Sequence, residues 1–323
     1  MKRRLLRITL VTCIVITSLF SGGIAYAQDE ELPTPGITPD SPFYFFDNLG
    51  KDIGMFFTFG PEAKARKALQ YAEERLSEAQ AMAGKNRVKE MEKAADGYDK
   101  FMAMVTERLG EIASHETSDN ISERVALATA KHLAILDGVK DKVPEKARDA
   151  ILKARDASIN GQVTALQALG INKPERALDI SSDTIEKLME RARFRISENV
   201  TADNVTGDVE EELDYADRIE KLEDELAAIA EEKGIDINAI QQHLAQSTTN
   251  RLDVLSGVYE KAPESARPAI ENAIENSVRK YERAVEKLKE KNTPQEITAN
   301  VTALQKLPEP IKEKLKIRVT NKA

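Results

Sequence analysis

Histidine is the residue type in this chain best suited to metal binding or acid–base catalysis, and it occurs at His115, His132 and His243. None of the three is spaced from another histidine or a cysteine as metal ligands on one helix would be. Glu111 lies one helical turn before His115, but carboxylate neighbours are unavoidable in a chain this acidic. We therefore predict no metal site and interpret the histidines as helix-face or partly buried polar residues.

Carboxylates are abundant, but nothing in the sequence indicates the burial or crowding that would raise the pKa of one of them for general acid catalysis. The sequence also lacks a nucleophile elbow, a phosphate-binding loop, a dinucleotide fingerprint and a calcium loop. Its one cysteine, Cys13, lies in the N-terminal apolar run, so the rest of the chain has no thiol chemistry. We predict no catalytic residue, no cofactor and no enzymatic activity.

An export signal is predicted for residues 1–27. A basic start precedes an uncharged apolar run, and Ala25-Tyr26-Ala27 forms a cleavage pattern just before Gln28. An uncleaved membrane anchor is the alternative, because Ile8–Ala27 is uncharged and about as long as a bilayer span. Either way, we expect an extracytoplasmic location: secreted, periplasmic or associated with the cell surface.

Composition narrows the class of protein further. From Gln28 onward the chain has 43 basic and 55 acidic residues, a formal net charge of −12, which argues against a nucleic-acid partner or an anionic membrane. The 323 residues are 32% charged and 5% aromatic and include no tryptophan, which is typical of long helices. We predict an all-α fold, with membrane contact only through an uncleaved signal segment.

A proline-rich tether, residues 28–42, precedes an aromatic amphipathic helix in residues 43–60. We favour a helix that docks its apolar face on the bundle. The alternative is an interfacial or partner-binding helix, although the charges of Asp47 and Asp52 count against a membrane role. The candidate partner-binding residues are Phe43, Phe45, Phe46, Phe56 and Phe57.

An internal duplication organises the rest of the chain. His132–Ser158 and Arg251–Ser277 are identical at 13 of 27 positions without gaps. Each copy has room for four helices, so we predict tandem four-helix bundle-like units: copy 1 in residues 61–170, copy 2 in 171–291, and a helical tail in 292–323. We interpret Gly170–Pro174 as a break. The expected helices lie near 61–83, 86–116, 119–142 and 144–169 in copy 1, and near 182–199, 206–233, 236–261 and 263–291 in copy 2. A proline at the repeated Val143-Pro144 and Ala262-Pro263 steps is expected at a first helical position.

These residues also resemble a known family. The motifs are Pro35–Phe45 (PGITPDSPFYF), Phe56–Phe59, Ala72–Leu76, His132-Leu133 and Val143–Glu145. They are similar to the secreted bacterial and archaeal domain-of-unknown-function family numbered 5667, over roughly Leu32 to Leu169. The second copy departs from the family pattern at Arg251, where that pattern has histidine. The resemblance implies an extracytoplasmic, all-helical module and implies no activity.

The sequence therefore favours an exported, non-enzymatic helical protein of the cell envelope or extracellular space, a protein-interaction or structural, chaperone-like module with an unknown macromolecular partner. The alternative is a protein that binds a ligand or metal ion on its acidic helix faces. An enzyme of unrecognised type is the least favoured class.

Overall fold

The computed structural model describes residues 32–113, 115, 118–197, 202–235, 237–290, 304–305 and 307–314. The regular secondary structure in these ranges is helical, without a strand, which confirms the all-α prediction. The predicted signal segment 1–27 and most of the predicted tail 292–323 lie outside them. Residues up to Thr34 and residues from Pro35 onward form separate units, and every helix below belongs to the second.

The helices follow the predicted order closely. They are α2 (Tyr44–Phe56), α3 (Pro61–Gly84), α4 (Val88–Ile112), α5 (Asp119–Lys140), η2 (Glu145–Ala147), α6 (Arg148–Asn172), α7 (Pro174–Ser197), α8 (Ala202–Glu232), α9 (Ile237–Lys261), α10 (Arg267–Glu290) and α12 (Glu309–Lys314). Helix α7 begins at Pro174 rather than near residue 182. Proline at a first helical position lacks only an N–H that would have no partner there, so the helix starts directly after α6 ends.

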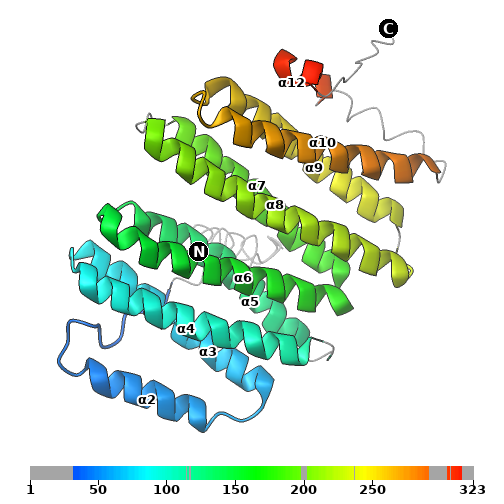
Figure 1. Cartoon of the computed structure of the whole chain (residues 1–323). Coiled ribbons are helices and arrows are strands. Elements are labelled where there is room, and N and C mark those ends of the chain that lie inside the picture. The colour runs from blue at the N-terminus through cyan, green and yellow to red at the C-terminus, as the bar shows by residue number, and fades with distance from the viewer. Residues whose placement is uncertain are drawn as a thin grey trace, which may run out of the picture. The chain divides into compact units, whose positions relative to one another are not determined.

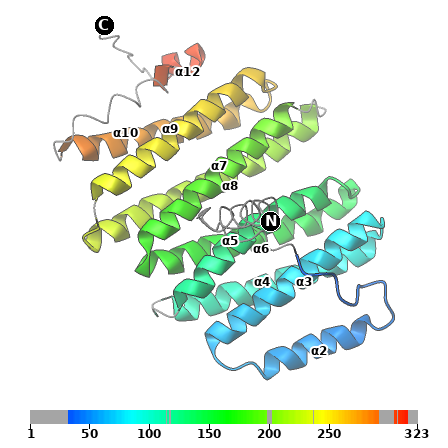
Figure 2. The same cartoon turned by 180° about the vertical axis from the view of Figure 1, so that it is seen from behind.

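Consecutive helices pair as hairpins, and the hairpins stack in two layers (Figures 1 and 2). Helices α3, α5, α7 and α9 form one layer, while α4, α6, α8 and α10 form the other. Across the boundary between the two repeat copies, α6 packs on both α7 and α8. The hairpins of the two copies therefore continue into one another within a single compact unit.

The repeated proline makes the same turn in both copies, but it does not begin the next helix. Ala147 N–H donates to the Pro144 carbonyl at 2.8 Å, and Ala266 N–H donates to the Pro263 carbonyl at 3.0 Å. Pro144 itself is extended, with ψ of 153°. Helices α6 and α10 consequently begin at Arg148 and Arg267, a few residues after the predicted position.

The core consists of aliphatic, methionine and tyrosine side chains between the helices, with small residues where helices approach closely. Ala154, Gly161 and Ala165 of α6 are buried. A Cβ at Gly161 would overlap the end of Met102 from α4. Glycine at this position therefore leaves room for the Met102 side chain between α4 and α6.

Part of the C-terminal segment packs on the last hairpin. Leu304 lies against the buried cluster of Ala245, Tyr281, Ala284 and Val285, and Leu307 and Ile311 are themselves buried. Within the described ranges, no helix has both the length and the apolar character needed to cross a bilayer.

Candidate interaction surface

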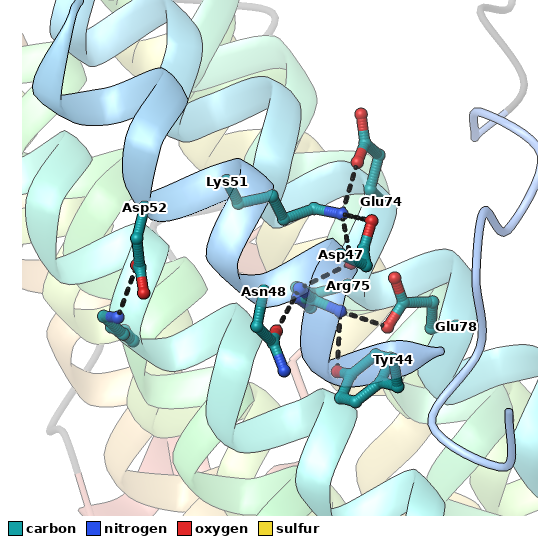
Figure 3. A network of polar contacts seen from close by, with 9 residues as sticks. Tyr44, Asp47, Asn48, Lys51, Asp52, Glu74, Arg75 and Glu78 are labelled. Carbon is teal, nitrogen blue, oxygen red and sulfur yellow. Dashed lines mark hydrogen bonds and ion pairs between the residues drawn. The ribbon is translucent and has the colours of Figure 1, made fainter. Parts of the chain in front are cut away.

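Helix α2 rests on the bundle with its polar side. Tyr44 and Lys51 are the buried residues of this helix, with 4% and 5% of their surfaces exposed. Tyr44, Asp47, Asn48 and Lys51 recur at i, i+3, i+4 and i+7, so they form a stripe along one helix face. Figure 3 shows these side chains gathered around Arg75 of α3. Polar contacts, rather than the apolar face, therefore hold the helix.

Arg75 is the centre of this attachment and is almost completely buried. Its Nη1 atom donates to Tyr44 Oη and Glu78 Oε2, each at 2.6 Å. Its Nη2 atom donates to Asn48 Oδ1 at 2.6 Å and to Asp47 Oδ2 at 3.0 Å. The guanidinium also lies 4.8 Å from the centre of the Tyr44 ring, a favourable cation–π arrangement. One side chain of α3 thus binds three residues of α2.

The electrostatics of this network depend on Arg75 staying charged. Burial opposes its charge, but attraction by Glu78, with contributions from Tyr44 and Asp47, raises the pKa of Arg75 above its ordinary value. Burial raises the pKa of Glu78, and Arg75 offsets only part of that effect. The Glu78 Oε1 atom is buried without a hydrogen-bond partner in the described structure. Glu78 is therefore compensated chiefly through its ion pair with Arg75.

Further contacts fix the helix along its length. The Lys51 ammonium lies 2.6 Å from Asp47 Oδ2 and 3.0 Å from Glu74 Oε2. Lys93 of α4 lies over the Tyr44 ring, 4.5 Å from its centre. A Cβ at Gly54 would collide with the hydroxyl of Tyr71 on α3, so glycine permits the close approach of α2 to this side chain.

The opposite face of α2 is apolar and exposed. Nine of the ten exposed large apolar side chains in the described structure lie between Ile37 and Phe59, and the tenth is Phe194 of α7. The five predicted partner-binding phenylalanines are between 62% and 77% exposed: Phe43, Phe45, Phe46, Phe56 and Phe57. Folding has therefore concentrated almost all of the accessible large apolar side chains on one helix and its ends.

The favoured prediction, that α2 docks its apolar face on the bundle, is wrong. The apolar and polar stripes are equally regular in the sequence, so periodicity alone does not say which one docks. The signal in the sequence for a docked polar face was that Asp47 and Asn48 lie on the same stripe as Tyr44 and Lys51. What the sequence could not show is that Arg75 would be buried opposite that stripe and satisfy it.

The structure describes the side chains of two of the three histidines. His132 is buried, and its Nδ1 atom is 2.9 Å from the Tyr98 hydroxyl, with which it shares a hydrogen bond. Burial lowers the pKa of His132 to about 3, so it is neutral at pH 7. His115 is exposed, and the side chain of His243 lies outside the described residues. Within the described ranges, no three histidine, cysteine or acidic side chains are grouped so that they could hold a metal ion.

A second buried ionic cluster joins the two repeat copies. Arg155 of α6 pairs with Asp137 of α5 at 2.8 Å and with Glu212 of α8 at 3.1 Å, and it also contacts Glu211. Arg191 of α7 adds an ion pair to Asp137 at 2.9 Å. Burial, with a smaller contribution from Asp137, raises the pKa of Glu212 to about 7. This cluster links four helices inside the array.

The raised pKa of Glu212 predicts a measurable pH dependence. Between its ordinary pKa of 4.5 and about 7, Glu212 keeps its proton in the folded protein but has lost it in the unfolded chain. This difference in proton binding stabilises the folded protein at low pH, and the stabilisation is lost as pH rises through 7. Relative to wild type, the unfolding free energy of Glu212→Gln should therefore increase by about 2–3 kcal/mol from pH 5 to pH 8. Urea denaturation at several pH values measures this difference. His132 has the opposite pH dependence, which cancels because both proteins contain it.

A hollow of about 290 Å³ between α7 and α9 bears on the predicted ligand-binding alternative. Its lining includes Asp179, Asp183 and Arg251. Arg251 is already ion-paired with Glu220 inside the core, so its charge is compensated without a ligand. The hollow therefore gives no specific support for a small-molecule site.

The fold and this surface together define a helical array protein that presents a separate aromatic helix, held through a buried arginine, to its surroundings. Residues 36–146 match the model of a family described as a domain of unknown function (DUF5667). The predicted resemblance to that family is thus confirmed for this part of the chain, which runs from before α2 into η2 and includes Arg75. No curated protein and no solved structure matches the chain.

Proposed function

We propose that this chain is an exported, non-enzymatic interaction module of the cell envelope or extracellular space. Its contact surface would be the exposed aromatic face of α2. The observation that carries the proposal is that nearly all exposed large apolar side chains of the described structure lie on α2 and the residues flanking it, since patches of this kind mark interaction sites. The export pattern in residues 1–27 supports the location.

The non-enzymatic part of the proposal is supported by how the buried charges are arranged. Arg75, Arg155 and Arg251 each pair with carboxylates between packed helices. Their neighbouring acids are therefore engaged in ion pairs inside the fold rather than directed into a substrate-sized cleft. This arrangement suits structural charge compensation better than acid–base catalysis.

A localised face favours a specific contact over a general chaperone role. Apart from Phe194, the large apolar side chains of the other described helices are buried or partly buried in the array, whereas a chaperone for unfolded clients would expose apolar grooves along several helices. Photo-crosslinking in the native host tests this. A crosslinkable residue at Phe56 should label a defined set of neighbours, and one at Phe194 should not. Equal labelling at the two positions would contradict the proposal.

Serine at Phe45, Phe46, Phe56 and Phe57 together should leave the fold intact. These side chains are largely exposed, so their loss should change the unfolding free energy by less than about 1 kcal/mol. Helical circular dichroism and Tm measure this. A large drop in Tm would instead show that these phenylalanines belong to the core.

A further inference from the structure

We infer that the partner of the α2 face is a lipid bilayer surface of low net charge, into whose interfacial zone the phenylalanines insert. This inference rests on the proposed function, because it names the partner of the same surface. Its premise is the observed orientation of the helix: polar side on the protein, apolar side outward.

The shape of the face suits an interface between water and acyl chains. At 100° per residue, its apolar residues fall within an arc of about 120°, roughly opposite the stripe that contacts Arg75. They are Phe45, Phe46, Leu49, Ile53, Phe56 and Phe57. The arc carries no charged side chain, and adjacent phenylalanines widen it, with edge-to-face pairs at 5.7 and 5.2 Å. Helices lying in a membrane surface have this broad apolar side.

The acidic charges that argued against a membrane role are removed by the fold. Asp47 points into the bundle, where Arg75 and Lys51 neutralise it. Asp52 lies at the margin of the apolar arc and is 3.4 Å from Lys100 of α4. Neither carboxylate would have to enter the apolar zone for the phenylalanines to do so.

The dimensions of the face disfavour a second copy of the chain as its occupant. A helix of 13 residues is about 20 Å long, so its exposed side covers only a few hundred Å². A stable protein dimer buries roughly 800 Å² on each partner. A bilayer needs no matching surface, because its interior accepts each side chain individually.

The tether is long enough to permit this contact in either form of the chain. The 15 residues from Gln28 to Pro42 span at most about 50 Å, so an uncleaved apolar segment and α2 could share one membrane. After cleavage, α2 would be the remaining membrane contact. The formal net charge of −12 from Gln28 onward predicts weaker binding to anionic lipids and little loss of binding in salt.

The absence of tryptophan from the sequence permits a site-specific experiment. Phe56→Trp and Phe194→Trp each place a single reporter at an exposed phenylalanine, on α2 and α7 respectively. The chain from Gln28 is suitable, because the unit from Pro35 onward contains all the described helices and their core. With phosphatidylcholine vesicles, emission from Phe56→Trp should shift to the blue and be quenched by brominated lipid. Phe194→Trp should show neither effect.

Three further measurements complete the expected result. Vesicle binding should persist in 1 M NaCl and weaken when phosphatidylglycerol is included. Serine at Phe45, Phe46, Phe56 and Phe57 should reduce vesicle binding about tenfold or more, since most of the inserted surface is lost. The unchanged Tm of that variant would exclude unfolding as the cause.

The outcomes separate this inference from the proposed function. Unchanged Phe56→Trp emission with vesicles would overturn the lipid assignment. If the Phe56→Trp emission instead shifts with protein concentration while the molecular mass in solution doubles, a second copy of the chain covers the α2 face. If a crosslinkable residue at Phe56 labels a specific protein in cells but Phe56→Trp does not respond to vesicles, the proposed interaction module is supported and the lipid assignment is wrong. If neither vesicles nor crosslinking gives a signal at Phe56, both proposals are wrong.

Discussion

Replacing Arg75 by methionine is expected to release helix α2 and to lower the unfolding free energy of the chain by about 3–5 kcal/mol. Removing one partner from a buried ionic network leaves the other charges without compensation, which accounts for a loss of this size. Here Glu78 would remain buried, and Asp47 and Asn48 would lose their link to α3. Hydrogen exchange should show α2 amides losing protection, and urea denaturation measures the global loss.

A matched control is available on the same helix. Arg66 pairs with Glu62 at 3.0 Å, but both side chains are substantially exposed, so Arg66→Met should change stability by less than about 1 kcal/mol. Adding Glu78→Gln to Arg75→Met should recover part of the loss, because it removes the uncompensated carboxylate. If α2 stays protected in Arg75→Met, the arginine is not what attaches it.

Arg155→Met should have an effect of similar size at a different place in the fold, about 3–5 kcal/mol. Arg155 is buried and compensates Asp137 and Glu212, which lie on different helices. Its removal should therefore weaken the junction between the two repeat copies as well as the total stability. Chemical denaturation should show a lower midpoint and a broader transition, as the halves begin to unfold separately.

The control for this variant is Arg176→Met. Arg176 of α7 pairs with Glu123 at 2.7 Å in a substantially exposed position, so its loss should be worth less than about 1 kcal/mol. Combining Arg155→Met with Glu212→Gln should restore part of the stability. An Arg155→Met variant as stable as Arg176→Met would mean that the cluster contributes nothing to joining the copies.

Much of the helical architecture could be predicted because its determinants are local. Period 3.6 patterns and helix-breaking residues placed most helix ends within a few residues of those observed. Pro268 illustrates this: a proline is tolerated in the first turn of a helix, and α10 begins one residue before it, at Arg267. The start of α7 was missed because Pro174 was interpreted as part of a break rather than as a first helical residue.

The orientation of α2 could not be predicted because it depends on a residue far away in the sequence. An amphipathic helix offers two faces, and burial of the apolar one is the usual outcome. Here Arg75, 28 residues after Asp47, supplies the hydrogen bonds that permit the polar face to be buried. The same limitation applies to Arg155 and Glu212, which are separated by 57 residues and meet only through stacking of hairpins.

The duplicated cores have diverged in chemistry while keeping their backbone turns. His132, neutral and bonded to Tyr98, occupies the position where the other copy has Arg251, which is ion-paired with Glu220. Each residue is tolerable only beside its own neighbours, since an arginine next to Tyr98 would be a buried, uncompensated charge. The two halves are therefore no longer interchangeable. A chimera that exchanged their hairpins would keep the shared backbone turns but would place buried side chains beside the wrong neighbours.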